Sequence, residues 1–282
     1  MKKCITLVMM FFITFMFSQT TSKTNIMSFN IRYDEPNDKE QNWHHRKENV
    51  VKMLKFYDLD MMGFQEVLLS QLNYLKTNLE EYAVVGVGRE DGVDKGEFVP
   101  IFYRKNRFEK VETGTFWLSE TPDKVSKGWD ANLERIVTWV VLLDKRSEKE
   151  FLILNTHFDH RGVEARIKSA QLLKSKIVGI SKGRQVILTG DFNSLPDSDA
   201  IQGLTDSTDD DSLVNSEMVA KLTYGPNWTS PGFDTKPFDQ RRVIDYIFLK
   251  NISAVNRYAV FTEKLNEICL SDHCPVFIQI EM

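Results

Sequence analysis

Acidic, amide and histidine side chains recur where short apolar segments of this sequence begin or end. Six segments carry them: Asn30 lies in IMSFNIRYD, Glu66 follows MMGFQ, His157 closes FLILNTH, Asp191 and Asn193 close VILTGDFN, Asp245 interrupts RVIDYIF, and Asp272 and His273 precede CPVFIQI. Any one of them has an ordinary structural explanation, because an aspartate after a strand often caps a turn and a single histidine is usually structural. The six segments together predict a metal-assisted hydrolase site.

The segments that carry these residues have the composition of β-strands. They are rich in Val, Ile, Phe and Tyr, and charged or turn-forming stretches separate them. We expect strands over residues 25–31, 61–65, 83–87, 98–103, 136–143, 151–156, 185–189, 243–249 and 275–280. The charged stretch 144–150 favours a β-hairpin between the strands on either side of it.

Apolar residues at helical spacing occur in three places. They are Val50, Val51 and Leu54 after Trp43; Leu68, Leu72, Leu75 and Leu79; and Ala165, Ile167, Leu172, Leu173 and Ile177. Strands outnumber helices, which favours two packed sheets flanked by helices over a doubly wound parallel sheet. No linker, repeat or low-complexity segment divides residues 19–282, so we expect a single domain there.

The composition is that of a globular protein. Hydrophobic residues make up 42% and charged residues 27% of the 282 residues, which excludes a disordered or collagen-like chain. The net charge of -4 provides no basic excess to bind a polyanion by charge alone. The acidic stretch 206–211 lacks the spacing of an EF-hand, so a solvated loop is favoured over a calcium site. Cys269 and Cys274 are too few for a disulfide scaffold, and their spacing leaves a single bridge open.

The first residues differ in character from the rest. Lys2 and Lys3 precede an apolar run over residues 5–17, and polar residues 18–20 follow. The run is shorter than the ~20 apolar residues of a membrane-spanning helix, so a cleaved signal peptide over residues 1–18 is favoured over a retained anchor. We therefore expect a secreted or periplasmic protein with no stable membrane association after cleavage.

The segments FNIRYD, FQEV, NTHFDH, TGDFN, IDYIF and SDHCPV make the sequence resemble the endonuclease/exonuclease/phosphatase superfamily, which has the fold of pancreatic deoxyribonuclease. They occur in the family's order, and TGDFN with SDHCPV is a specific pair. GEFVPIFYRK, GTFWLSETP, GWDAN and NTHFDHRG are most similar to its secreted bacterial branch. The resemblance implies an α/β fold, a four-layer α/β/β/α sandwich with two mainly antiparallel central sheets, and a site at one end of those sheets.

The same resemblance implies catalytic roles for four of the polar residues. His273 matches a general base or phosphate-polarising histidine, and Asp245 would hold its ring. Asp191 would align or deprotonate the attacking water, and Asn193 would donate to that water or to a phosphate oxygen. The resemblance leaves open whether Asp191 or His273 takes the proton.

Further residues are implied to contact the substrate. His157 matches a second catalytic histidine, which donates to the phosphate or leaving oxygen, and Glu97 would orient its ring. Asp159 and His160 could line the substrate pocket or could cap a helix that begins near residue 163, since aspartate commonly caps helices. Asn30 is implied to lie beside both the substrate and the metal.

A hard divalent cation is implied at this site. The anionic oxygens of a phosphate ester repel a nucleophile, and Mg²⁺, or Mn²⁺ in its place, would neutralise them. Glu66 is the candidate for the direct metal ligand, with Asn30 and Asp272 beside it. A zinc site of the protease type is disfavoured, because the sequence has no H-E-x-x-H segment and no cysteine ligand set.

Three functions remain to be compared. The first is an exported, metal-dependent phosphodiesterase or phosphatase, acting as a monomer on a small-molecule or carbohydrate-linked phosphate ester. The second is a secreted nuclease, which the acidic balance disfavours only mildly, since metal ions screen acidic surfaces. The third is an inactive binding protein on the same fold, which is disfavoured because both histidines and their acidic partners are present.

Overall fold

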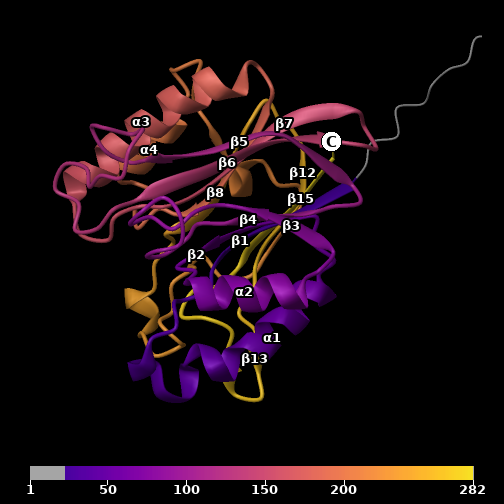
Figure 1. Cartoon of the computed structure of the whole chain (residues 1–282), viewed down its shortest axis with the longest axis vertical. Coiled ribbons are helices and arrows are strands. Elements are labelled where there is room, and N and C mark those ends of the chain that lie inside the picture. The colour runs from indigo at the N-terminus through magenta and orange to yellow at the C-terminus, as the bar shows by residue number, and fades with distance from the viewer. Residues whose placement is uncertain (1–22, 282) are drawn as a thin grey trace, which may run out of the picture.

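Two β-sheets stack face to face at the centre of the computed structural model, which describes residues 23–281 (Figure 1). Helices cover the outer face of each sheet. The layers therefore follow the order helices, sheet, sheet, helices, which confirms the predicted four-layer α/β/β/α sandwich. The predicted signal peptide at residues 1–18 lies outside the described residues.

The two sheets contain seven and six strands. The first has the spatial order β10 (Thr223–Tyr224), β12 (Val255–Val260), β15 (Val276–Glu281), β1 (Lys23–Asn30), β2 (Met61–Gln65), β4 (Ile101–Arg104) and β3 (Tyr82–Val85). The second has the order β5 (Phe108–Trp117), β6 (Ile136–Asp144), β7 (Lys149–His157), β8 (Gln185–Asp191), β11 (Asp245–Lys250) and β9 (Val214–Asn215). A short ribbon joins β13 (Lys264–Leu265) and β14 (Ile268–Cys269).

Most neighbouring strands pair antiparallel, as predicted. Among the described strands the parallel pairs are β1–β2, β10–β12 and β7–β8. The predicted hairpin is present, since β6 and β7 pair antiparallel across the charged stretch. Strand β5 was not predicted, because its exposed residues 109–113 include three charged side chains and break the apolar pattern of a strand.

Four α-helices complete the outer layers of the described chain. Helices α1 (Trp43–Phe56) and α2 (Leu69–Asn78) pack on the seven-stranded sheet, and α3 (Val163–Ser181) and α4 (Asp199–Thr205) pack on the six-stranded sheet. The apolar stripes predicted α1, α2 and α3, but not the two-turn helix α4. Short 3₁₀ helices span Pro36–Gln41, Ser216–Val219 and Phe238–Gln240. No helix among residues 23–281 is long and apolar enough to cross a membrane.

The two sheets approach each other closely beside the last residues of β2. A Cβ added at Gly63 would lie 2.1 Å from Thr189 Oγ1 of the opposite sheet, so only glycine fits there. Asn155 crosses the same interface and donates to the carbonyl oxygen of Phe64 at 2.7 Å. A third contact joins Gln65 Nε2 to Asn155 Oδ1 at 2.6 Å. These contacts fix the relative position of the strand ends where the polar residues lie.

Strand register brings the polar residues to one end of the sandwich. The parallel pair β7–β8 aligns His157 with Asp191, and the antiparallel pair β8–β11 places Asp245 opposite Asp191. In the other sheet, the parallel pair β1–β2 aligns Asn30 with Gln65, one residue before Glu66. The carboxyl ends of β1, β2, β7 and β8 therefore meet the beginnings of β11 and β15.

Candidate active site

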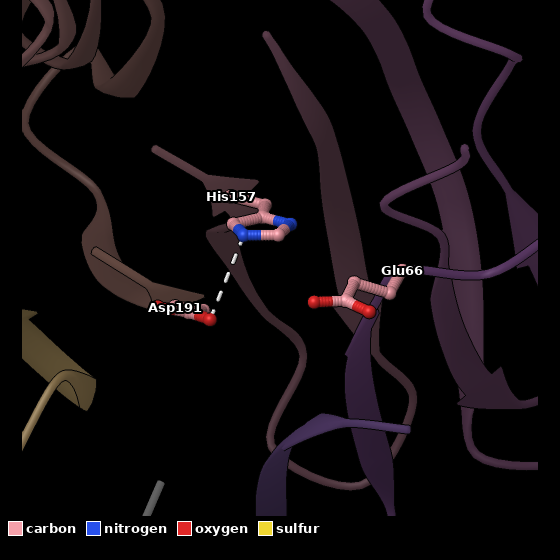
Figure 2. Close-up of side chains that lie close together, drawn as sticks. All are labelled: Glu66, His157 and Asp191. Atoms are coloured by element: carbon pink, nitrogen blue, oxygen red, sulfur yellow. Dashed lines mark ion pairs between the residues drawn. The ribbon is translucent and has the colours of Figure 1, made fainter. Parts of the chain in front are cut away.

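Asp191 lies at the centre of the polar cluster. Its Oδ2 accepts a hydrogen bond from Asn30 Nδ2 at 2.9 Å, and its Oδ1 accepts one from the backbone N–H of Asn193 at 2.9 Å. The same carboxylate lies 3.6 Å from His157 Nε2 and 3.7 Å from His273 Nδ1. Figure 2 shows the His157 ring facing Asp191. Side chains from both sheets therefore surround one carboxylate.

His273 is held by a carboxylate on a strand of the other sheet. Its Nδ1 lies 2.9 Å from Asp245 Oδ2, and Thr229 donates its hydroxyl to the same oxygen at 2.6 Å. Burial opposes charge on the imidazole, but Asp245 and Asp191 outweigh it and raise the pKa of His273 well above its ordinary value. The ring is therefore an imidazolium at neutral pH, with Asp245 binding Nδ1.

His157 is neutral, and its neighbours decide where the ring proton lies. Burial, with Arg135 and Arg89 nearby, lowers the pKa of His157 well below its ordinary value. Asn193 Nδ2 donates to the carbonyl oxygen of Phe158 at 3.0 Å and lies 3.1 Å from His157 Nε2. Since an amide N–H needs an acceptor, Nε2 carries the lone pair and Nδ1 carries the proton.

Glu97 faces the protonated nitrogen of His157. Its Oε2 lies 3.8 Å from His157 Nδ1, which is too long for a hydrogen bond, and it is paired with Arg89 at 2.8 Å. Among residues 23–281, Nδ1 has no hydrogen-bond partner. The structure thus places Glu97 where the predicted orienting residue would stand, with Arg89 holding its carboxylate.

Glu66 enters the cleft from a sparsely populated backbone conformation. Its φ is 59°, in the left-handed region that residues other than glycine rarely adopt. Oε1 accepts from Asn30 Nδ2 at 3.0 Å, and Oε2 accepts from the backbone N–H of Tyr33 at 3.2 Å. Figure 2 shows this carboxylate beside His157 and Asp191.

Burial and nearby carboxylates raise the proton affinity of two acids in the cleft. Burial raises the pKa of Glu66, and the charges of Asp272 and Glu97 raise it further. Burial and the charge of Asp245 raise the pKa of Asp191 to about 7. Burial is the largest cause of both pKa shifts, and the neighbouring carboxylates add to it.

This arrangement fits a divalent cation. Glu66, His157 and Asp191 offer ligand atoms that all lie within 4.8 Å of one another. Arg32 Nη1 lies 3.8 Å from Glu66, but that guanidinium is already paired with another carboxylate. Carboxylate oxygens in such a group suit a hard cation. Asp272, the other predicted acidic ligand, belongs to no such group among the described side chains, although its charge acts on Glu66.

Asp159 and His160 occupy different environments. The Asp159 carboxylate accepts hydrogen bonds from four backbone N–H groups, those of Asn132, Leu133, Arg161 and Gly162. It does not line the cleft, and its backbone partners all precede α3. The N–H groups of Glu164 and Ala165 in the first turn of α3 donate instead to Asp130. His160 does line the cleft, and its Nδ1 lies 3.0 Å from Arg135 Nη2.

Comparison with known proteins identifies the family. Residues 27–273 match the Endonuclease/Exonuclease/phosphatase family. The chain belongs to the endonuclease/exonuclease/phosphatase family. It is also 27% identical over 249 residues to the uncharacterized protein L388 of Acanthamoeba polyphaga mimivirus, across 85% of this chain and 92% of that protein.

Two solved structures from Bacteroides have the same fold at higher identity. An endonuclease/exonuclease/phosphatase from Bacteroides vulgatus is 39% identical, with a TM-score of 0.88 over 93% of this chain and 99% of that one. A mannosyl-6-phosphatase from Bacteroides thetaiotaomicron is 38% identical, with a TM-score of 0.84 over 90% of this chain and 98% of that one. This member of the endonuclease/exonuclease/phosphatase family is a phosphoric ester hydrolase, and the prediction of an enzyme rather than an inactive binding protein is confirmed.

Three further residues of the site were not predicted from the sequence. Thr229 binds Asp245 from a loop, 16 positions away in the sequence. Arg135 lines the cleft immediately before the first residue of β6. Most of the predicted site residues instead lie where strands end. Arg46 on α1 is buried and donates to backbone carbonyls on both sides of the site, those of Ile31 and Leu270. Only the tertiary contacts reveal these roles.

The catalytic cleft is smaller than a second cavity beside it. The cleft has a volume of about 370 Å³, and the neighbouring cavity, about 750 Å³, lies between the loop before β11 and the β13–β14 ribbon. Among the lining residues only His273 is shared by both. The acidic cluster lines the smaller space, so we place the chemistry there. Cys269 and Cys274 line the larger cavity as free, buried thiols.

Proposed function

We propose that this enzyme is an exported, divalent-metal-dependent hydrolase of a small-molecule or carbohydrate-linked phosphate ester. The observation that carries the proposal is the convergence of His157, His273 and Glu66 on Asp191 within a single cleft. Such a group can position a water molecule, bind a phosphate and neutralise charge at one point. The mannosyl-6-phosphatase at 38% identity supports a carbohydrate-linked substrate.

The protein's own residues divide the chemistry between the two sheets. Asp191 aligns the attacking water, because its carboxylate lies between the two histidines. His273, held by Asp245, donates to a phosphate oxygen and stabilises the charge that develops there. Asn193 fixes the tautomer of His157, which faces the phosphate or the leaving oxygen.

We propose Mg²⁺, with Mn²⁺ as a substitute, as the resident cation. Glu66 would hold it, with Asn30 and Asp272 beside it and Asp191 close by. When bound, the cation supplies charge neutralisation for the phosphate oxygens. The close grouping of ligand atoms from Glu66, His157 and Asp191 supports this assignment.

A nuclease remains the second candidate. The net charge of -4 gives the enzyme no basic excess for binding a polyanion, and this favours a small substrate. A metal-dependent nuclease needs the same cluster, so the cluster itself does not separate the two candidates. Activity on DNA and on sugar phosphates distinguishes the two.

The test compares substrates under identical conditions. The purified enzyme with Mg²⁺ is assayed on mannose 6-phosphate, mannosyl oligosaccharide phosphates, nucleotides, inositol phosphates, sphingomyelin, DNA and RNA, and then again in excess chelator. We expect the highest kcat/KM on a carbohydrate phosphate, and loss of turnover in chelator. A matched Glu66→Gln variant should lose both turnover and the rise in Tm that Mg²⁺ produces. Rapid DNA cleavage without sugar phosphate hydrolysis would establish the nuclease instead.

We also propose that residues 1–18 are a signal peptide that directs the enzyme out of the cytoplasm. The two lysines followed by a short apolar run support this. N-terminal sequencing of the protein from its native cells should find a chain that begins near Gln19. A soluble cytoplasmic chain that still begins at Met1 would contradict export, and would leave the catalytic proposal untouched.

A further inference from the structure

Arg135 brings a buried guanidinium with unused donors to the wall of the cleft. Its side chain is 4% exposed, and its Nη2 lies 3.0 Å from His160 Nδ1. Within residues 23–281, Nε and Nη1 have no hydrogen-bond partner. A buried N–H without an acceptor is costly, so its retention in the cleft wall points to an acceptor that a ligand supplies.

Arg107, a buried arginine with a structural role, has closer carboxylate partners than Arg135. Arg107 is equally buried, and it pairs with Asp144 and Asp60 at 2.9 Å. Arg135 has only Asp159 within ion-pair distance among the described carboxylates, at 3.5 Å from Nε. That carboxylate is already engaged by four backbone N–H groups. Much of the charge on Arg135 is therefore available to a ligand in the cleft.

The backbone on either side holds Arg135 in place. The carbonyl oxygen of Arg135 accepts from the backbone N–H of Leu118 at 2.7 Å, and β6 begins at the next residue. In the loop before Arg135, the backbone N–H groups of Asn132 and Leu133 donate to the Asp159 carboxylate. Nε faces Asp159 at 3.5 Å, whereas Nη1 has no partner among the described residues. A rigidly held guanidinium whose Nη1 is unpartnered offers N–H donors to the oxygens of a phosphate group.

The other arginine of the cleft is differently occupied. Arg32 is paired with Asp38 at 2.9 Å and lies 3.8 Å from Glu66, so acidic side chains of the protein share its charge. Arg135 instead stands next to His160, which accepts at Nδ1 and so carries its proton on Nε2 when neutral. No lysine lines the cleft among the described residues. The N–H donors of Arg135 and His160 thus lie together on one wall.

We infer that Arg135 and His160 form the subsite for the terminal oxygens of a phosphate monoester, and that this subsite makes the enzyme prefer monoesters to diesters. A monoester has three non-bridging oxygens and a charge near −2 at pH 7, with a second pKa of about 6. Compared with a monoester, a diester lacks one of these non-bridging oxygens and carries one negative charge less. The extra oxygen and charge are what a fixed guanidinium with an unpartnered N–H donor recognises. The inference rests on the proposed cleavage of phosphate esters in this cleft.

The experiment compares Arg135→Met, Arg135→Lys and wild type on 4-nitrophenyl phosphate and bis(4-nitrophenyl) phosphate with Mg²⁺. The two substrates share a leaving group and differ in the terminal oxygen. Wild type should prefer the monoester. Arg135→Met should lower kcat/KM on the monoester by about 30-fold or more, and on the diester by less than about threefold. Arg135→Lys keeps the positive charge but lacks the planar guanidinium, and it should lower kcat/KM on the monoester about tenfold.

Binding of inorganic phosphate, measured by titration calorimetry, gives a readout that needs no turnover. The dissociation constant should rise about tenfold or more in both Arg135 variants. It should stay unchanged in Arg257→Met, a control that removes an exposed arginine from β12. Equal losses on both esters, unchanged phosphate binding, or a wild-type preference for the diester would overturn the inference. If wild type cleaves neither ester, the proposed function fails, and phosphate binding alone then decides whether Arg135 belongs to an anion subsite.

Discussion

Asn30 and Asp191 are hydrogen-bonded across the interface between the two sheets, at 2.9 Å, although 161 positions separate them in the sequence. Asn30 ends β1 in one sheet, and Asp191 ends β8 in the other. The same amide nitrogen also donates to Glu66 at 3.0 Å. One neutral side chain therefore binds two carboxylates that repel each other, the buried Asp191 and the partly buried Glu66.

Replacement of this amide should destabilise the metal-free enzyme. Asn30→Asp removes the donor and adds a third buried acid, and an uncompensated buried charge costs about 3 kcal/mol or more. We expect a fall in Tm of several degrees in chelator, with partial recovery in Mg²⁺, because a cation neutralises the cluster in the folded state. Asn30→Ala removes the donor without adding charge, and its Tm should respond less to Mg²⁺. Scanning calorimetry measures the Tm of both variants. A Tm equal to that of wild type for Asn30→Asp in chelator would contradict the predicted destabilisation.

The pair formed by His273 and Asp245 should dominate the catalytic rate. Loss of one preorganised donor to the developing charge costs about 10²–10³-fold, so His273→Ala should lower kcat at least about a hundredfold while the fold stays intact. Asp245→Asn should lower kcat by a smaller factor, because the ring remains but loses the charge that favours the imidazolium. Thr229→Val, which removes the hydroxyl that binds Asp245, should lower kcat less again. Near-normal turnover by folded His273→Ala would mean that the active centre lies elsewhere.

His157 should matter most when the leaving group is poor. The ring is neutral in the free enzyme, and a phosphate anion beside it favours its protonation, which allows donation to the leaving oxygen. His157→Ala should therefore lower kcat more on alkyl than on aryl phosphate esters, because aryl oxides leave without a proton. The ratio of kcat values for the two ester types, in wild type and variant, is the measurement. A ratio that does not change assigns His157 to binding alone.

Asp159 should contribute stability that depends on pH. Burial opposes its charge, but hydrogen bonds from the backbone of Gly162, Arg161 and Asn132 outweigh this and lower its pKa to about 2, from an ordinary 3.8. A folded-state pKa below the unfolded value stabilises the fold above pH 3.8, and this stabilisation is lost as the pH falls toward 2.

The matching variant is Asp159→Asn, which cannot accept these bonds with a charge. Its Tm should lie below that of wild type by a constant amount above about pH 5, and the difference should shrink toward pH 2. Calorimetry over that range provides the check. A difference in Tm that is independent of pH down to the lowest values would show that the carboxylate charge is not the cause.

The layers of this fold and most of its polar cluster could be predicted from the amino-acid sequence. Alternating and continuous apolar runs specify strands locally, and the stripes of α1, α2 and α3 specify helices, because burial demands a fixed periodicity. Polar residues such as Glu66, His157 and Asp191 stood out because strands have no local need for them at their ends. The family motifs then predicted how these ends come together.

The contacts of each polar residue depend on the three-dimensional packing and could not be predicted from the sequence. Asp159 and His160 are neighbours in the sequence, yet one binds backbone N–H groups and the other lines the cleft. Thr229 and Arg135 have no local pattern, since their roles depend on partners that long loops and strand register bring to them. Hydrogen bonding and charge compensation act over a few ångströms in space, whereas periodicity reports only neighbours along the chain. For this reason the sequence predicts the strand ends, and the packing of the two sheets decides the chemistry between them.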